Sequence, residues 1–302
     1  MEKASKVRGV YAPITTPFLD NEELDEGGLR RNMAFYAASP LHGYLALGSN
    51  GENKSLSWEE KLKVLSIIAE GRGKNQTLMA GIIFDSTIES LRFIREAEKL
   101  RPNYLTLLAP SYFAKQMTDD VLFHYFSTLA DSTNIPCLLY NAPQFSGGVV
   151  LSAALISRLS SHPNILGVKD SYNAASISSY LLAAQKDLSV MAGSADYFLY
   201  AMTLGATGGV LSLANIFPAL TNELYELALS GQFEKAFTLN KKVLQLNKGV
   251  SGKGGVAAVK YAMDIAGLCG GKPRLPLLPL EKNTAESIKN VITEFQNAHP
   301  VN

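Results

Sequence analysis

The chain has 302 residues, and its 28 lysines and arginines are balanced by 27 aspartates and glutamates, giving a formal net charge of +1. This balance excludes the basic surface of a nucleic-acid-binding protein and the polybasic segment that anchors a protein to anionic lipid, so we expect neither nucleic acid nor a membrane as a partner. Hydrophobic residues make up 47% of the chain and charged residues 18%, a globular composition whose length fits two ordinary domains or one α/β barrel.

Short apolar runs alternate with longer amphipathic stretches along the first two thirds of the chain. Several runs, such as YLTLL at residues 104–108 and CLLY at residues 137–140, are apolar throughout, which is typical of parallel strands covered on both faces. In chain order, the expected strands are Gly9–Thr15, Gly43–Leu47, Thr77–Ile83, Tyr104–Ala109, Ile135–Tyr140, Ile165–Lys169, Leu188–Ala192 and Gly208–Leu213.

Helix signals lie between these strands. Ser57 and Glu60 have the spacing of a capping box, and the amphipathic stretch that follows them ends at Gly71. Further helices are expected to begin near Asp85, Met117, Ser152 and Ala174. About eight βα units fit before residue 220, which predicts an α/β fold of the (β/α)8 TIM-barrel type rather than half of a Rossmann fold.

The strand signals stop at Phe217. Four helices are expected beyond that point, at Phe217–Leu229, Phe233–Lys248, Gly254–Leu268 and Thr284–Ala298. No long Pro/Gly/Ser linker separates them from the rest of the chain. We therefore divide the chain into a (β/α)8 barrel, residues 1–216, and a C-terminal helical region packed on the barrel, residues 217–302.

The carboxyl ends of the strands carry the active site in a parallel barrel, and Lys169 ends the apolar run ILGVK. Apolar surroundings disfavour a charged amine, and a neutral amine attacks carbonyl carbons to form a Schiff base. A lysine that extends from a strand end into solvent is the alternative. Tyr140 ends the preceding strand, so its hydroxyl could make the proton transfers that imine formation needs, unless it is an ordinary core tyrosine.

The loop GSNGE at residues 48–52 follows the second expected strand. Its glycines free the backbone to turn, and a small carboxylate could be held by Ser49, Asn50 and the backbone N–H groups. An ordinary turn would have the same residues and is the alternative. A carboxylate cradle, a lysine nucleophile and a tyrosine proton relay are what a 2-oxo acid such as pyruvate needs. No histidine ends an expected strand, which argues against a mononuclear metal hydrolase.

Compartment and redox state are indicated by the two cysteines and by the apolar runs. Cys137 and Cys269 are too few for a disulfide framework or a cysteine-based zinc site. The first residues lack the apolar core of a signal peptide, and no apolar run reaches the roughly 18 residues that cross a bilayer. We therefore expect a cytoplasmic protein.

Six motifs, joined by two late segments, follow one another along nearly the whole chain. They are PITTPF at residues 13–18, GSNGE at 48–52, YNAP at 140–143, GVKD at 167–170, AGS at 192–194 and GGVLS at 208–212, with VK at 259–260 and RLPL at 274–277. In these motifs the chain resembles the dihydrodipicolinate synthase / N-acetylneuraminate lyase family of class I (Schiff-base) aldolases.

The resemblance implies roles for particular residues. Lys169 would bind pyruvate or a keto-acid substrate as an imine, and Tyr140 would relay protons. Ser49 and Asn50 occupy the family's carboxylate-binding and relay positions.

Further residues of the family pattern lie on other loops. Tyr112 matches a catalytic tyrosine that family members insert into the neighbouring subunit's site, and the backbones of Gly193 and Leu211 would line the substrate pocket. The resemblance also implies a barrel with C-terminal helices, a homotetramer built as a dimer of dimers, and chemistry without cofactor or metal.

Two departures from the family pattern bear on the substrate. Dihydrodipicolinate synthases usually carry an arginine where this chain has Phe145, and sialic-acid lyases carry an acidic pair of which residues 194–196 keep only part. The motifs GSNGE, KDS and AGSA are more similar to those of 4-hydroxy-2-oxoglutarate and 2-keto-3-deoxy sugar acid aldolases, in which case Ser171 could contact the distal part of the substrate.

We therefore expect a pyruvate-dependent Schiff-base aldolase acting on a 2-oxo acid with a hydroxyl at C4, its small-molecule partners being pyruvate and an aldehyde. The first alternative is dihydrodipicolinate synthase, which condenses pyruvate with aspartate semialdehyde in lysine biosynthesis. An alternative of another class is a non-catalytic barrel that binds a keto acid.

Overall fold

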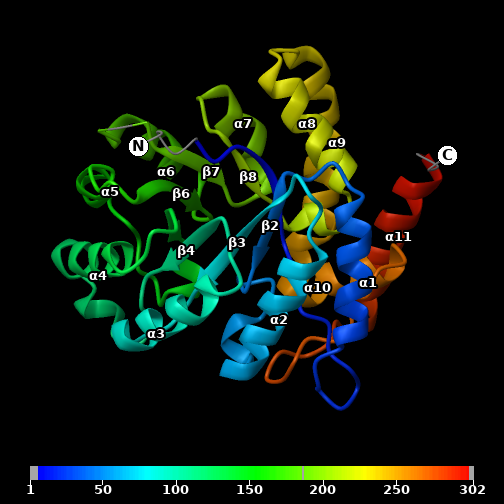
Figure 1. The fold of residues 1–302 in the computed structure, drawn as a ribbon. Coiled ribbons are helices and arrows are strands. Elements are labelled where there is room, and N and C mark those ends of the chain that lie inside the picture. The colour runs from blue at the N-terminus through cyan, green and yellow to red at the C-terminus, as the bar shows by residue number, and fades with distance from the viewer. Residues whose placement is uncertain (1–5, 186, 299–302) are drawn as a thin grey trace.

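The computed structural model describes residues 6–185 and 187–298. Within these residues, eight parallel strands pair in chain order and close into a barrel, as the sequence predicts (Figure 1). The strands are β1 (Gly9–Pro13), β2 (Gly43–Ala46), β3 (Thr77–Ile82), β4 (Tyr104–Leu108), β5 (Cys137–Asn141), β6 (Ile165–Asp170), β7 (Ser189–Ala192) and β8 (Gly208–Val210).

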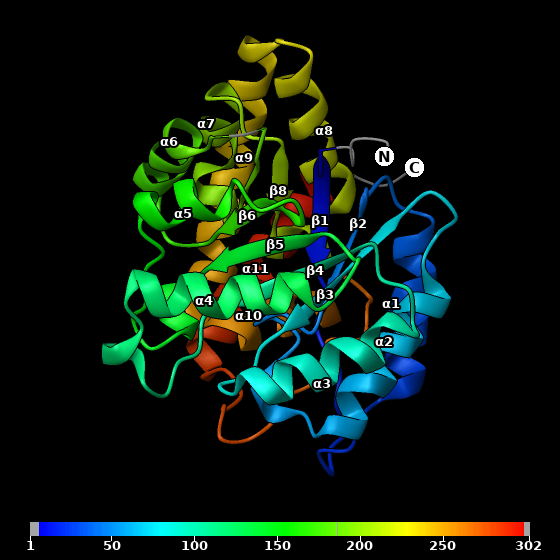
Figure 2. The same cartoon turned by 60° about the vertical axis from the view of Figure 1, so that its left-hand side comes forward.

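Helices surround the barrel, and each helix from α1 to α8 contacts the next (Figures 1 and 2). The helices are α1 (Glu26–Ala37), α2 (Trp58–Gly71), α3 (Thr87–Glu98), α4 (Asp119–Asp131), α5 (Ala153–Leu159), α6 (Ala174–Ala183), α7 (Phe198–Thr203), α8 (Pro218–Leu229), α9 (Phe233–Gly249), α10 (Ser251–Ile265) and α11 (Lys282–Ala298). No helix in the described part of the chain is long and apolar enough to cross a membrane.

Local signals account for most helix starts. The capping box of α2 is present, with the Ser57 hydroxyl accepting from the Glu60 N–H while the Glu60 carboxylate accepts from the Ser57 N–H. The sequence did not reveal α1, because its first turn contains two glycines, which weaken the helix signal. Asp25 caps this helix by accepting a hydrogen bond of 2.7 Å from the Gly28 N–H.

Strand ends differ from the expected ones where the backbone turns. Leu47 has a φ of 59°, which takes it out of extended geometry and ends β2 at Ala46. The expected strand Gly208–Leu213 ends at Val210, because residues 212–215 form a short 3₁₀ helix. These early ends leave the residues that follow β2 and β8 free to line the carboxyl mouth of the barrel.

The amino end of the barrel interior is packed with buried side chains. They come from six different strands and the segment before β1, and they are Val7, Tyr11, Leu45, Met79, Leu138, Met191 and Val210. A second and larger core lies between the outside of the barrel and the helices. Because side chains fill the amino end, a small molecule has room only near the carboxyl ends of the strands.

The C-terminal helices follow β8, and α9, α10 and α11 contact one another (Figure 1). Helix α8 packs on β1 and α7, the place of the eighth barrel helix. The expected helix Gly254–Leu268 begins earlier, at Ser251, and is broken at Gly254 and Gly255, whose φ and ψ are not helical. The division of the chain at residue 216 stays a prediction, and residues 1–5, 186 and 299–302 of that division lie outside the described residues.

Candidate active site

A cavity of about 620 Å³ opens at the carboxyl ends of the strands. Its wall combines residues at or just after the ends of six strands with the first half of α10, so the C-terminal region covers the mouth of the barrel. Six residues carry most of the chemistry discussed below: Ser49, Asn50, Tyr140, Lys169, Ser171 and Ser212.

Lys169 and Tyr140 are direct neighbours across the β5–β6 pair, where they occupy the same register position. Leu138, two residues before Tyr140, belongs to the interior core, so side-chain alternation directs Tyr140 into the barrel as well. Both side chains belong to residues that are only 3% exposed. The Lys169 Nζ lies 3.9 Å from the centroid of the Tyr140 ring, so an amine and a phenol meet at the base of the cavity.

The Tyr140 hydroxyl is hydrogen-bonded to the Ser49 hydroxyl at 3.2 Å. Burial by itself raises the pKa of Tyr140, but the Lys169 ammonium and hydrogen bonds with Ser49, Lys169 and Ser171 together lower it below the ordinary value for tyrosine. The phenol is therefore held in contact with both a cation and further proton-carrying hydroxyls. An amine and a phenol arranged in this way can form an imine with a ketone and move the protons that this requires.

The loop after β2 contributes two polar side chains to the cavity. Ser49 reaches Tyr140, and Asn50 donates a hydrogen bond of 2.8 Å from its Nδ2 to the Ser212 hydroxyl. The loop is a tight turn in which the Gly51 N–H bonds the Gly48 carbonyl at 3.1 Å. The structure thus brings Ser49 and Asn50 of this loop to the same cavity as Lys169.

Gly193 and Ser171 lie against each other in the cavity wall. A Cβ atom at Gly193 would come within 1.9 Å of the Ser171 Oγ and 2.8 Å of the Asp170 carbonyl oxygen, so only glycine fits. The Gly193 N–H donates to that carbonyl at 2.6 Å. Both residues line the cavity, and Ser171 lies within hydrogen-bonding reach of the Tyr140 hydroxyl.

Two predicted site residues do not line the cavity within this single chain. Tyr112 is 80% exposed and packs edge-on against Phe113. Leu211 is fully buried, its N–H bonds the Tyr11 carbonyl, and the wall of the cavity is formed instead by the residues on either side of it, Val210 and Ser212.

Sequence reasoning missed a buried anchor beside Lys169. The Asp170 carboxylate accepts hydrogen bonds from the Asn141 side chain at 2.8 Å and the Tyr172 N–H at 3.1 Å, and it is also bonded to the Ser176 hydroxyl. Burial raises the pKa of Asp170 despite these bonds. The sequence signal was available, because Asp170 directly follows the lysine at the strand end.

The C-terminal half of the wall also went unpredicted. Tyr197 lines the cavity, and its hydroxyl donates a hydrogen bond of 2.8 Å to the Asp170 carbonyl. The broken start of α10 adds Gly254 and Gly255 to the wall. Phe145, at the position where the sequence departs from the family, also lines the cavity. Among the described residues of this wall, Lys169 is the one lysine or arginine.

Comparison with known proteins places this geometry in a family. The sequence profile of the dihydrodipicolinate synthetase family matches residues 6–295. The chain is 32% identical to a 4-hydroxy-tetrahydrodipicolinate synthase of Methanothrix thermoacetophila, covering 96% of this chain and 97% of the relative. It is 30% identical to a protein of Emericella nidulans named as a probable mitochondrial 4-hydroxy-2-oxoglutarate aldolase, covering 95% of this chain and 94% of that protein.

Solved structures agree with the sequence comparison. The fold matches that of a dihydrodipicolinate synthase of Acinetobacter baumannii, solved in complex with pyruvate, with a TM-score of 0.90 and 28% identity over 96% of this chain and 99% of that one. The synthase of Methylacidiphilum fumariolicum matches with a TM-score of 0.91 and 29% identity over 97% of each chain. From its profile match and these full-length similarities, the chain belongs to the dihydrodipicolinate synthetase family and is a lyase of the aldolase type.

Proposed function

We propose that this protein is a Schiff-base aldolase that cleaves a 2-oxo acid with a hydroxyl at C4 into pyruvate and an aldehyde. The observation that carries the proposal is the contact between the Lys169 amine and the Tyr140 ring at the base of the cavity. The pyruvate complex of the structurally similar Acinetobacter baumannii synthase supports the same choice of keto acid.

In the proposed mechanism, the Lys169 ammonium first gives up a proton to solvent, and the resulting neutral amine attacks the C2 carbonyl of the substrate. Tyr140 gives a proton to the carbinolamine oxygen, water leaves, and an iminium ion forms. The Tyr140 phenolate left by that transfer then takes the proton of the C4 hydroxyl while the C3–C4 bond breaks. The electron pair of that bond moves into the iminium, which becomes an enamine. The enamine is protonated at C3, and hydrolysis of the imine releases pyruvate and restores the amine.

Ser49, Asn50 and Ser171 are proposed to serve this reaction from the cavity wall. Ser49 continues the proton relay, since it is hydrogen-bonded to Tyr140 at 3.2 Å. Asn50 and the backbone of the loop bind the C1 carboxylate. Ser171 and the backbone of Gly193 face the distal part of the substrate. Leu211 is buried, so the substrate meets its neighbours Val210 and Ser212 instead.

The charge of the wall favours an aldehyde without a carboxylate. The lining includes the acidic Asp196. Among the described residues of the wall, Lys169 is the one lysine or arginine, and its amine is used for the imine. Aspartate semialdehyde and glyoxylate both carry a carboxylate, which such a wall would leave without a cationic partner. Of the substrates expected from the sequence, a 2-keto-3-deoxy sugar acid therefore fits best, because the aldehyde it releases is uncharged.

Dihydrodipicolinate synthase activity is the second candidate. The names of several relatives support it, including that of Methanothrix thermoacetophila. Against it stands Phe145, a phenyl ring in the cavity wall that cannot make the bidentate contact of a guanidinium with a carboxylate.

We also propose that the active form is a cytoplasmic homotetramer in which Tyr112 enters the site of a neighbouring copy. The exposure of Tyr112 and Phe113, 80% and 61%, supports a surface that a second copy covers.

Reduction with borohydride in the presence of pyruvate tests the chemistry. We expect a mass gain equal to pyruvic acid less one oxygen atom, located on Lys169 and lost in Lys169→Ala. If the wild-type protein gains no mass, the aldolase proposal is refuted, and a non-catalytic barrel that binds a keto acid remains as the alternative.

A panel of substrates then separates the enzyme candidates. Pyruvate release is measured from 2-keto-3-deoxy sugar acids and from 4-hydroxy-2-oxoglutarate, and condensation is measured with pyruvate and aspartate semialdehyde. Turnover of aspartate semialdehyde that equals or exceeds cleavage would overturn our preference.

A further inference from the structure

Lys260, on α10, is fully buried behind the cavity wall rather than in it. Its ammonium donates three hydrogen bonds, to the Thr16 carbonyl at 2.8 Å, the Glu52 carboxylate at 2.8 Å and the Lys272 carbonyl at 2.7 Å. These three acceptors use every donor of an ammonium group. Lys260 therefore joins α10 to the segment after β1 and to the end of the loop after β2.

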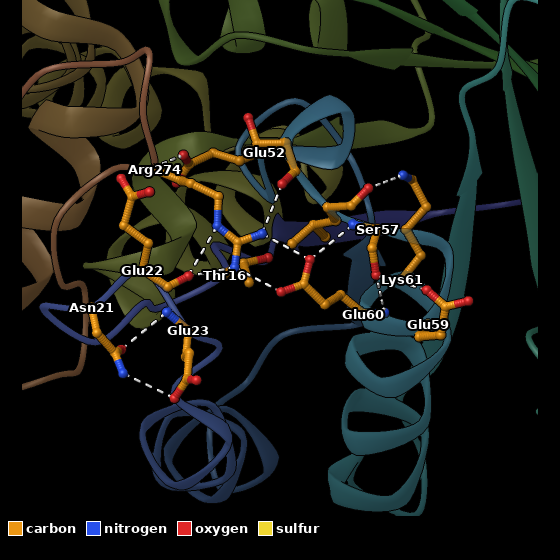
Figure 3. Close-up of polar contacts among 12 residues, drawn as sticks. Thr16, Asn21, Glu22, Glu23, Glu52, Ser57, Glu59, Glu60, Lys61 and Arg274 are labelled. Atoms are coloured by element: carbon orange, nitrogen blue, oxygen red, sulfur yellow. Dashed lines mark hydrogen bonds and ion pairs between the residues drawn. The ribbon is translucent and has the colours of Figure 1, made fainter.

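Glu52 receives this ion pair at the last position of the Gly48–Glu52 loop. Its side chain is 1% exposed, and its second carboxylate oxygen accepts a hydrogen bond of 2.9 Å from the backbone N–H of Arg274. Glu52 also has a φ of 51°, an unfavourable conformation for a residue with a side chain, so the surrounding contacts must hold it there. Figure 3 shows Glu52 and Arg274 together, with Thr16 next to them.

The ion pair is connected to the catalytic hydroxyls through one turn of backbone. The Glu52 N–H donates to the Ser49 carbonyl at 3.1 Å, and the Thr16 hydroxyl donates to the Gly51 carbonyl at 2.8 Å. Ser49 in turn is hydrogen-bonded to Tyr140. Fixing the end of the loop at Glu52 thus fixes the place of the Ser49 hydroxyl over the proposed proton relay.

We propose that Lys260 is a positioning residue of this enzyme, whose ion pair with Glu52 holds the Gly48–Glu52 loop so that the Ser49 hydroxyl stays bonded to Tyr140. The inference rests on the proposed Schiff-base function. A buried ion pair is on average no more stabilising than a well-packed apolar pair, so stability alone gives little reason for one here. The positioning role accounts for its place, directly behind the turn that carries Ser49 and Asn50.

A partial reaction tests the role without knowledge of the aldehyde. The protein-catalysed exchange of the methyl protons of pyruvate with D₂O passes through the imine and its enamine, and NMR measures its rate above that of pyruvate alone. In the paired variant Lys260→Met/Glu52→Gln, which leaves no buried charge unpaired, we expect exchange to slow at least about tenfold, because small displacements of catalytic groups have effects of that size or larger. The borohydride adduct on Lys169 should still form.

Coupling to Ser49 separates positioning from a general loss of structure. If the pair acts through Ser49, adding Lys260→Met/Glu52→Gln to Ser49→Ala should slow exchange no further than Ser49→Ala alone. Independent effects that multiply would overturn the proposal. Thr16→Val keeps the ion pair and removes only the hydroxyl bond to Gly51, so it serves as a second variant and should also slow exchange.

Lys61 provides a matched control. It is also a buried lysine, on α2, but its ammonium bonds the Leu56 carbonyl, outside the Gly48–Glu52 loop. Lys61→Met should keep the wild-type exchange rate per folded molecule. A wild-type protein without adduct or exchange refutes the proposed function, whereas normal exchange in folded paired and Thr16→Val variants refutes only the positioning role.

Discussion

The Lys169 amine lies over the face of the Tyr140 ring, 3.9 Å from its centroid, and the two residues share one register position of the β5–β6 pair. Burial would raise the pKa of the Tyr140 hydroxyl, but the positive charge of Lys169 and the hydrogen bonds with Ser49, Lys169 and Ser171 lower it instead. The phenol can therefore give up and regain its proton more readily than a buried tyrosine without these neighbours.

Replacing Tyr140 with phenylalanine keeps the ring beneath Lys169 and removes only the hydroxyl. We expect exchange of the pyruvate methyl protons to fall by about 10²–10⁴, the usual contribution of a positioned acid–base group. The Lys169 adduct should still form with borohydride, but more slowly. An unchanged exchange rate would remove Tyr140 from the mechanism.

Gly193→Ala tests the contact between Gly193 and Ser171. The new methyl group would lie 1.9 Å from the Ser171 Oγ, so the serine must rotate away from Tyr140 or the backbone must shift. We expect a loss of about 1–3 kcal/mol in the free energy of unfolding and at least tenfold slower pyruvate exchange. Thermal unfolding and NMR exchange measure the two effects.

A glycine without such a neighbour serves as the control. Gly27 is exposed on α1, and an added Cβ would meet only ordinary contacts of 3.4 Å or more. Gly27→Ala should leave the exchange rate unchanged and should not lower the free energy of unfolding, since alanine favours a helix over glycine by about 0.5–1 kcal/mol. Equal behaviour of the two variants would show that the space around Gly193 does not matter.

Phe145→Arg tests the proposed preference for an uncharged aldehyde. A guanidinium in this part of the wall can form a bidentate contact with a carboxylate, worth about 1.5–3 kcal/mol. We expect kcat/KM for aspartate semialdehyde, relative to that for an uncharged aldehyde, to rise about tenfold or more. Phe145→Leu, which adds no charge, should leave that ratio unchanged, and an equal ratio in the arginine variant would contradict the assignment.

The pH dependence of stability should report the pair of Arg274 and Glu60, which Figure 3 shows at the start of α2. Hydrogen bonds from Arg274 at 2.7 and 2.8 Å lower the pKa of Glu60 from its ordinary 4.5, although partial burial opposes them. Because the folded-state pKa is the lower one, the pair stabilises the fold fully above about pH 4.5, and the contribution is lost as pH falls through the folded-state value.

We therefore expect Glu60→Gln to unfold more easily than wild type by about 1–2 kcal/mol at pH 7, with the difference shrinking below pH 4.5. Urea unfolding at a series of pH values measures it. Glu59, the neighbouring and more exposed glutamate, provides the control variant Glu59→Gln, whose difference from wild type should be small at every pH. A difference for Glu60→Gln that does not change with pH would contradict the ion-pair explanation.

The sequence was sufficient for the barrel and for the central pair of the site. Parallel strands buried on both faces are apolar throughout, so their order could be followed along the chain, and a lysine at the end of such a strand stands out against its neighbours. Tyr140 and Ser49 could be associated with Lys169 because all three lie at or just after strand ends, which meet at one face of a barrel.

Tertiary structure alone decided which residues complete the wall and what holds it in place. Residues 254–257 and Val259 of α10 line the cavity, and Lys260 reaches Glu52 from 208 positions away, through packing between the C-terminal helices and the barrel mouth. Periodicity describes one element at a time and contains no information on such contacts. The exposure of Tyr112 likewise follows from the folded surface, because whether a loop side chain turns inward or outward depends on everything packed around it.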